Sequence, residues 1–500
     1  MGKKNKLVCL GDSLTQGFQN SCIYRTDLSY PAFLVNALDY RAEFHQPRFT
    51  ARGGIPINIE MLVRSLEEKY GPSFTAREFP SAVAYLFSTL KYVKNYWDGR
   101  VRSLRNQYQL TPYHNQSVWG LNINDAWMMT DEIARGFMKN NPVKYSVFNF
   151  LPDHAMYVTA RCVLNPAGNQ EFAKYSMLDN VSWLDRQQGI DNLIVYLGSN
   201  HIISAGGKLD IIYSKDSEVE ALPYERSYTV MRPEHFEHNY QKLAERINKL
   251  NPNTIITATI PYITLLPIMQ PIYRGEKSAQ QEYADYYTHF WINPEEFDPE
   301  YYPHLTRDQA LELDLVVDRY NAIIRSTADK YGWIVTPLNR LVYAASGRNP
   351  QKHQKPYSRD FIEALSNLPQ TRHLVSNGNV HLTTDFPETD EQNQLIKGGL
   401  ISLDGIHPTT TAYGLFAEVF MNVMKEKGVR FKGELDWNHI LTEDELVTNP
   451  PKILKPFRQI QYSLMQMFRG STRNGGIRFG KKQMFNSFDR ALAYIKNQVG

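Results

Sequence analysis

Short apolar segments that end at a glycine or a proline recur along the chain, and no other feature constrains its fold as strongly. Five such runs occur, at residues 7–10, 49–51, 192–197, 254–260 and 333–336. Segments of helical length lie between them. Continuous apolar runs are typical of strands that a parallel sheet buries on both faces. The pattern therefore predicts an α/β domain in which five parallel strands form the middle of three layers.

Helical patterns account for the outer layers of this domain. We expect helices at residues 30–38, 59–70, 235–250, 311–331 and 409–427. In the fourth of these, apolar residues recur every three or four positions, so one stripe of the helix is expected to face the sheet. We therefore predict a three-layer α/β/α, flavodoxin-like core within a domain that spans residues 1–430.

The intervals between the expected strands are uneven, and four of them are long. They lie near residues 71–180, 203–232, 262–308 and 342–400. Stretches of this length are rarely structureless in a compact domain, so we expect large helical or irregular insertions. Their aromatic clusters either pack the insertions onto the core or form a lid or cleft for an acyl chain or a sugar.

The last part of the chain differs in charge from the rest. Residues 451–500 hold ten Lys or Arg residues and a single acid, Asp489, whereas the whole chain has a net charge of +3. This composition predicts a basic, helical C-terminal extension over residues 431–500. Such a segment can lie on an anionic membrane surface or dock on an acidic protein face. No nucleic-acid-binding motif accompanies the charge, so we expect no nucleic-acid partner.

The sequence predicts neither a membrane span nor a targeting peptide. It has no run of 18 apolar residues, and the first apolar stretch is too short for a signal-peptide core. We therefore expect a cytoplasmic location, with peripheral association at a membrane surface left open. Cys9, Cys22 and Cys162 lack CxxC spacing, and the histidines suggest no metal cage, so we expect neither a metal nor a cofactor. The oligomeric state stays open.

A serine stands where the first expected strand ends and a helix should begin, in the motif Gly11-Asp12-Ser13-Leu14. The motif would hold the Ser13 hydroxyl on rigid backbone at the carboxyl edge of the sheet, where open α/β folds bind ligands. The N-terminus of the following helix favours negative charge that develops nearby. Ser13 is therefore a candidate nucleophile.

A second motif, Asp404-Gly405-Ile406-His407-Pro408, precedes the last expected helix. On a tight turn, a carboxylate three residues before a histidine can bind one imidazole nitrogen. The other nitrogen is then free to accept a proton from a serine. Asp404 and His407 are thus the candidate orienting acid and general base.

A third motif, Gly198-Ser199-Asn200-His201, follows the third expected strand. The Asn200 amide can donate a hydrogen bond to the oxyanion of a tetrahedral intermediate. A Gly-x-Ser-x-Gly elbow is absent from the sequence, which argues against the α/β-hydrolase fold.

Together these motifs resemble, in their order along the chain, the blocks of the GDSL, or SGNH, hydrolase superfamily. The resemblance implies metal-free ester hydrolysis through a Ser-His-Asp triad and an acyl-enzyme. It also implies an oxyanion hole built from the Ser13 N–H, the Asn200 side chain and a backbone N–H of a glycine block. We assign that block to Gly54, with Gly53 or Ile57 as alternatives.

The resemblance leaves the substrate open. After the asparagine the family commonly has Asp, whereas this chain has His201, which is either a local structural substitution or a substrate contact. The family includes esterases, lipases, lysophospholipases, thioesterases and carbohydrate deacetylases. We expect a small-molecule carboxylic ester with an acyl or lipid-like part. A carbohydrate O-acetyl esterase, or a non-catalytic binding or scaffold protein on the same fold, is the alternative.

Overall fold

A four-stranded parallel sheet forms the centre of the computed structural model. Its strands, in spatial order, are β1 (Asn5–Gly11), β4 (Ile190–Tyr196), β5 (Thr254–Ala258) and β9 (Ile334–Thr336). They correspond to four of the five predicted strands, so the α/β class is confirmed. The structure describes residues 4–73, 75, 77–99, 106–142, 152, 154–275, 281–348 and 357–454.

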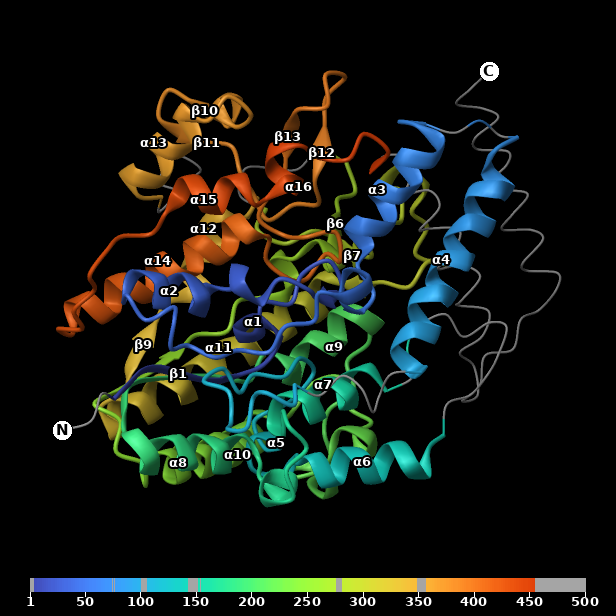
Figure 1. Cartoon of the computed structure of the whole chain (residues 1–500). Coiled ribbons are helices and arrows are strands. Elements are labelled where there is room, and N and C mark those ends of the chain that lie inside the picture. Colours follow the sequence, from blue (N-terminus) through green and yellow to red (C-terminus); the bar gives the residue numbers. More distant parts are fainter. Residues whose placement is uncertain are drawn as a thin grey trace.

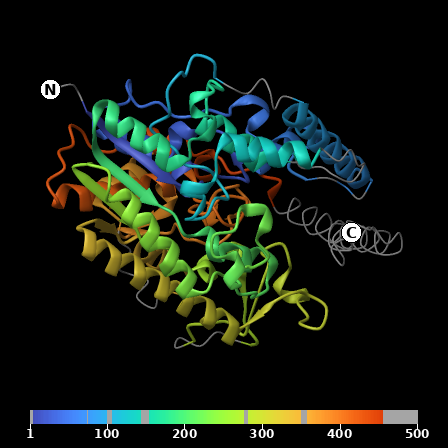
Figure 2. The same cartoon turned by 90° about the horizontal axis from the view of Figure 1, so that it is seen from below.

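Helices cover both faces of this sheet, as Figure 1 shows on either side of β1. Val8 and Leu10 of β1 belong to the apolar cluster that includes α10 and α11, which lie together in Figure 2. Leu7 and Cys9 belong to a second cluster with α2 and α14. Alternate side chains of a strand point to opposite faces, so each face has its own core. The helices that match predicted ones are α2 (Tyr30–Ala37), α3 (Ile59–Tyr70), α10 (Pro233–Ile247), α11 (Arg307–Tyr331) and α14 (Thr410–Glu426).

The predicted strand at residues 49–51 is wrong, so a core of five strands is not confirmed. A 3-10 turn, η2 (Ala51–Gly53), begins there, and residues 52–54 all have positive φ, which is incompatible with an extended strand. Beyond the turn, β3 (Ile55–Pro56) pairs antiparallel with β2 (Cys22–Ile23) in a separate two-stranded sheet. Phe49, the phenylalanine of this apolar run, is buried in the core. The run is therefore apolar because it is buried, although it does not pair with the central sheet.

A different stretch, the edge segment (residues 114–118), lies parallel to β1 on the side away from β4. The Cys9 N–H donates to the His114 carbonyl at 2.8 Å, and the Cys9 carbonyl accepts from the Gln116 N–H at 2.9 Å. The edge segment therefore extends the sheet beside β1, at a stretch where no strand was predicted.

The four predicted insertions hold most of the remaining elements. Residues 71–180 contain α4 (Phe79–Gly99), α5 (Asp125–Met128), α6 (Asp131–Asn140), α7 (Ala155–Leu164) and the start of α8 (Met177–Gln188). Residues 203–232 hold most of α9 (Asn200–Lys208) and two 3-10 turns. Residues 262–308 form an antiparallel sheet of β6 (Gln270–Ile272), β7 (Tyr286–Thr288) and β8 (Leu305–Thr306). Residues 342–400 contain the second half of α12 (Leu338–Ala345), together with α13 (Arg359–Asn367), β10 (Val375–Ser376), β11 (Asn379–Val380), β12 (Glu388–Thr389) and β13 (Leu395–Lys397). In the described part of the chain, no helix is both long enough and apolar enough to cross a bilayer.

Residues 431–454 turn back after α14 and pack against it. The ring of Trp437, in α15 (Trp437–Thr442), lies so close to Gly414 that a Cβ there would come within 2.7 Å of it. Asp444, which precedes α16 (Glu445–Thr448), accepts the Thr411 N–H at 2.7 Å. The predicted division at residue 430 stays a prediction. The basic part of the tail, from residue 455 onward, lies outside the described residues.

Asp444 makes the stability of this packing depend on pH. Burial raises the pKa of the Asp444 carboxyl from 3.8 to about 6, while the Thr411 N–H opposes the shift. Between these two values the folded protein holds a proton that the unfolded chain has released. The free energy of unfolding therefore falls as the pH rises through this window, and the contribution of Asp444 is constant above it.

The variant Asp444→Asn removes this titration because its side chain is neutral at every pH. We compare the melting temperature of the variant with that of the wild type at each pH. The difference, variant minus wild type, is expected to be larger at about pH 7 than at about pH 4, because only the wild type loses stability as the pH rises. Thermal unfolding followed by circular dichroism at both pH values measures the difference. A difference that stays constant between the two pH values would contradict the assignment to Asp444.

Candidate active site

Ser13 begins a short helix directly after the central strand β1. In α1 (Ser13–Gln16) the Asp12 side chain caps the helix by accepting the Leu14 N–H at 3.1 Å. A Cβ at Gly11 would overlap the side chain of Thr15, so the close approach of strand and helix requires glycine there. Ser13, a residue that is 7% exposed, thus lies at the carboxyl end of β1.

Asp404 and His407 form the predicted pair on one tight turn. The Asp404 Oδ2 accepts from the His407 Nδ1 at 2.9 Å, and its Oδ1 accepts from the His407 N–H at 2.8 Å. The Ser21 N–H adds a further bond to Oδ2 at 2.8 Å. Burial raises the pKa of the Asp404 carboxyl, but the charge and hydrogen bonds of His407 outweigh it, and the net pKa is lowered. Asp404 is therefore an ionised acceptor that leaves the Nε2 of His407 available.

The loop after α1 connects Ser13 to this turn. The Phe18 N–H donates to the Ser13 carbonyl at 3.0 Å, and the Phe18 ring packs against the His407 ring with centroids 4.5 Å apart. Burial raises the pKa of the Asp12 carboxyl to about 7, and the charge of His407 opposes this shift. The Asp12 carboxylate and His407 therefore interact electrostatically. Among the described residues, no hydrogen bond joins the Ser13 hydroxyl to His407. Ser13 and the Asp404–His407 pair are therefore connected through Phe18.

Asn200 lies at the same edge, as the first residue of α9. Its Nδ2 donates to the Leu121 carbonyl at 2.8 Å and approaches the Asp12 Oδ2 at 3.5 Å. The amide therefore sits between the turn that carries Ser13 and the loop around Leu121.

The glycine block is where the sequence-based assignment finds no support. The Gly54 N–H already donates to the Ala51 carbonyl at 3.0 Å, and the Ile57 N–H donates to the Ser21 carbonyl at 3.4 Å. Among the described residues, no hydrogen bond joins Gly54, Gly53 or Ile57 to Ser13 or to Asn200.

Gly120 is a better candidate than Gly54 for the glycine of this block, because it lies just after the edge segment, which runs along β1. The Val118 N–H donates to the Gly11 carbonyl at 3.2 Å, which holds this stretch against the end of β1. Gly120 has a φ of 78°, and its N–H makes no hydrogen bond within the described residues. Leu121 follows directly and is bound by Asn200. The sequence offered one signal, a glycine after the extended stretch Asn115-Gln116-Ser117-Val118-Trp119, but that stretch is too polar to resemble a buried strand.

His201 braces this glycine-bearing loop. It is fully buried, and its Nε2 accepts the Ile123 N–H at 3.3 Å. The Nδ1 of the neutral ring then carries the proton and faces the Tyr228 hydroxyl at 3.3 Å. Burial lowers the pKa of His201 well below its ordinary value, which keeps the ring neutral. These contacts favour the structural interpretation of His201 over a substrate contact.

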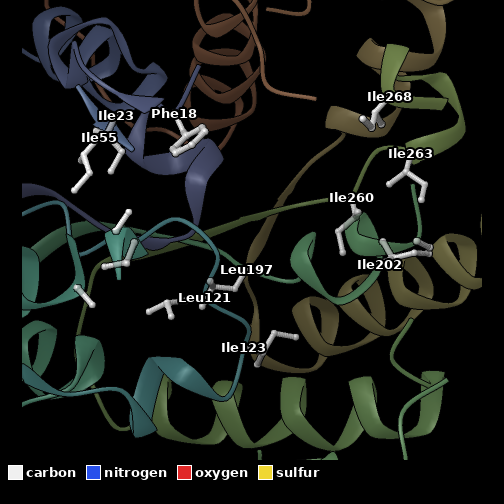
Figure 3. Packing of buried hydrophobic residues seen from close by; sticks show 14 of the residues in the cluster. Phe18, Ile23, Ile55, Leu121, Ile123, Leu197, Ile202, Ile260, Ile263 and Ile268 are labelled. Carbon is white, nitrogen blue, oxygen red and sulfur yellow. The ribbon is translucent and has the colours of Figure 1, made fainter. Parts of the chain in front are cut away.

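The loop is held from its other side by an insertion. Arg226 forms a buried ion pair with Asp125 at 2.6 Å, and the Asn122 side chain donates to the Tyr228 hydroxyl at 2.9 Å. Figure 3 shows Leu121 and Ile123 of the loop among the buried apolar side chains, with Leu197, which directly follows β4. The loop is thus fixed by both polar and apolar contacts.

Other catalytic chemistries find little support among the described residues. All three cysteines are buried, and burial raises the pKa of the Cys9 and Cys22 thiols, which disfavours a thiolate nucleophile. In the described part of the chain, no group of three His, Cys, Asp or Glu side chains is arranged to hold a metal ion. No protein-family model and no curated protein matches this chain.

Proposed function

We propose that this chain is a serine hydrolase that cleaves carboxylic esters, with Ser13 as nucleophile. The observation that carries the proposal is the 2.9 Å hydrogen bond between the Asp404 Oδ2 and the His407 Nδ1. With that nitrogen engaged, the Nε2 is the only ring atom able to accept a proton. Phe18 contacts both groups, because its ring packs against His407 and its backbone N–H donates to the Ser13 carbonyl.

In the proposed reaction, the His407 Nε2 takes the proton of the Ser13 hydroxyl as its Oγ attacks the ester carbonyl. The tetrahedral intermediate collapses, and the leaving alcohol receives that proton. Water then attacks the acyl-enzyme with His407 again as the base, which releases the acid and restores Ser13. The reaction requires the Ser13 Oγ and the His407 Nε2 to approach within hydrogen-bond distance.

The oxyanion of the intermediate would be bound by the N–H groups of Ser13 and Gly120 and by the Asn200 amide. This assignment replaces Gly54 with Gly120, for which the free N–H and the neighbouring Leu121–Asn200 contact are the support. With that change, the four blocks keep the order of the GDSL/SGNH superfamily. We propose that the core is of its flavodoxin-like type, with the edge segment in place of the fifth strand.

The variant Asn200→Ala tests the oxyanion assignment. Removal of one oxyanion donor is expected to lower kcat by about a hundredfold or more, with little change in KM, because the donor acts on charge that develops during the reaction. Steady-state kinetics on p-nitrophenyl acetate separate the two constants. A folded variant in which KM alone changes would contradict the assignment, since it would place Asn200 in ground-state binding.

The substrate class follows from the surroundings of the site. An acyl or lipid-like ester is the first candidate, because of the aromatic insertions and the basic tail that could rest on a membrane surface of a cytoplasmic enzyme. A carbohydrate ester is the second, because the superfamily that the four blocks resemble includes carbohydrate deacetylases.

A fluorophosphonate probe distinguishes an enzyme from a catalytically silent scaffold on the same fold. Only an activated serine reacts with this probe, so the wild-type chain is expected to be labelled at Ser13. Mass spectrometry identifies the modified peptide, and Ser326→Ala, which removes an exposed serine on α11, provides a matched control. A wild-type chain that stays unlabelled would refute the proposal.

A further inference from the structure

A tight turn of four residues lies shortly after Ser13 in the chain, and the mechanism above does not use it. In this hairpin turn (residues 19–22), Gln19 and Cys22 exchange two backbone hydrogen bonds of 3.0 Å. The two central residues, Asn20 and Ser21, have φ values of 53° and 61°. Positive φ at both central positions is typical of a type I′ turn, which favours asparagine. The bonds between Gln19 and Cys22 leave the N–H groups of Asn20 and Ser21 available for another segment.

Both sides of the hairpin turn are anchored in the fold. On the side of the nucleophile, the Phe18 N–H donates to the Ser13 carbonyl at 3.0 Å, and the Phe18 carbonyl accepts the Tyr413 hydroxyl at 2.7 Å. On the other side, Ile23 of β2 is fully buried and pairs with Ile55 of β3, as Figure 3 shows. The position of the hairpin turn relative to Ser13 is therefore fixed.

The acid–base turn (residues 402–407) is closed by hydrogen bonds of its own. The Ser402 N–H donates to the His407 carbonyl at 2.8 Å, and the Gly405 N–H donates to the Ser402 carbonyl at 3.0 Å. The two bonds between Asp404 and His407 lie within the same turn. A contact that positions the start of this turn therefore also positions His407.

Three hydrogen bonds join the hairpin turn to the acid–base turn. The Asn20 N–H donates to the Ser402 Oγ at 2.9 Å, and the Asn20 Oδ1 accepts the Leu403 N–H at 3.0 Å. The Ser21 N–H donates to the Asp404 Oδ2 at 2.8 Å. Asn20 thus makes two of the three bonds, one through its backbone and one through its side chain.

Helix α3 sets the orientation of the Asn20 amide. The Asn20 Nδ2 donates to the Glu60 Oε2 at 2.8 Å, while the Glu60 Oε1 accepts from the Arg64 guanidinium at 2.7 Å. A carboxylate can only accept, so Glu60 selects the NH2 group of the amide and leaves its oxygen for the Leu403 N–H. Asn20 is only 4% exposed, so water offers little competition for these bonds.

We propose that Asn20 is a positioning residue that aligns the acid–base turn with Ser13, a role that rests on the proposed hydrolase function. Asn20 acts through Ser402 and Leu403, which begin the turn that carries His407. Its side chain contributes no group to the reaction itself. Loss of this side chain therefore changes the approach of the base to the nucleophile and leaves the binding of the ester unchanged.

The variant Asn20→Gly removes the side chain, and glycine accepts the positive φ of the turn. We expect kcat for p-nitrophenyl acetate to fall by about a hundredfold with little change in KM, because a misplacement of about 1 Å suffices for such a loss. The matched control is Asn377→Gly, the same exchange at an exposed asparagine with a φ of 50°, which should keep the wild-type rate. Thermal unfolding shows whether each variant is folded. A change in KM alone would contradict the positioning role.

A pair of substitutions tests whether the contact with Glu60 acts on the rate. Asn20→Asp alone sets a second carboxylate against Glu60, and we expect kcat to fall by about tenfold as the two side chains separate. Combining it with Glu60→Gln restores the net charge and reverses the direction of the bond, because the amide at position 60 donates to the carboxylate at position 20. This double variant keeps an acceptor for the Leu403 N–H and is expected to recover most of kcat. A folded double variant as slow as Asn20→Asp would overturn the proposal.

The positioning role and the hydrolase function fail in different ways. A wild-type chain that hydrolyses no ester removes the hydrolase and this role of Asn20 with it. Hydrolysis by the wild type, together with an unchanged kcat in folded Asn20→Gly, leaves the hydrolase standing and overturns only the positioning role.

Discussion

Replacing Ser13 with alanine is expected to lower kcat/KM for p-nitrophenyl acetate by about five powers of ten while the fold stays intact. In the proposed mechanism the Ser13 hydroxyl is the nucleophile, so its removal leaves no route to an acyl-enzyme. The change is also structurally mild. The cap of α1 uses the Asp12 side chain and the Leu14 N–H, neither of which involves the Ser13 hydroxyl.

The measurement is steady-state hydrolysis, with thermal unfolding as the check on folding. The variant Ser326→Ala removes an exposed serine on α11 and should turn over the ester at the wild-type rate. Turnover by folded Ser13→Ala that matches the wild type would mean that another group performs the attack.

The central sheet could be predicted because its strands are buried on both faces. Continuous apolar runs follow directly from that burial, and β1, β4, β5 and β9 all appear as such runs. The same criterion failed at residues 49–51, where the chain is apolar because it packs in the core, while positive φ angles at the next residues turn it away from the sheet.

The edge segment shows the opposite error. Residues 114–118 run along β1, yet most of their side chains are polar, so no apolar run marks them. The side chains of His114, Asn115 and Gln116 are buried in specific hydrogen bonds instead, such as the one that the Asn115 amide donates to the Thr15 carbonyl at 3.0 Å. Such partners come from distant parts of the chain, and their positions depend on the finished fold.

The sequence likewise predicts some residues of the candidate site and not others. Ser13, Asn200 and the Asp404–His407 pair were predicted because each lies in a short motif at the end of an expected strand or before an expected helix. Gly120, which we propose in place of Gly54, was not among the predicted residues because its position depends on the edge segment, which the apolar pattern does not reveal.

The contacts that hold the loop after Gly120 could not be predicted from the sequence. The pair between Arg226 and Asp125 joins residues about a hundred positions apart, and both are nearly inaccessible to solvent. Removing one partner of such a buried pair costs about 3–5 kcal/mol, because the other charge stays buried alone. The insertion of residues 203–232 therefore belongs to the architecture of the site.

The variant Asp404→Asn is expected to lower kcat by about four powers of ten, because the wrong tautomer of His407 becomes the stable one. In the wild type, the Asp404 carboxylate accepts a hydrogen bond from the Nδ1–H of His407, so the Nε2 is an acceptor. If the amide keeps its oxygen on the backbone N–H groups of Ile406 and His407, its NH2 group faces the ring. The ring proton then moves to the Nε2, which can no longer take the proton of Ser13.

Nitrogen-15 NMR of the histidine side chains measures this tautomer directly, and steady-state kinetics measure the loss of rate. The matched control is Asp444→Asn, the same chemical change at another buried carboxylate, which alters the dependence of stability on pH and should leave kcat unchanged. If Asp404→Asn retained wild-type kcat, or if its His407 still carried the proton on the Nδ1, the carboxylate would not orient the base. A loss of rate together with the shifted proton, in a chain that melts as a folded protein, ties the activity to the pair of side chains on this one turn.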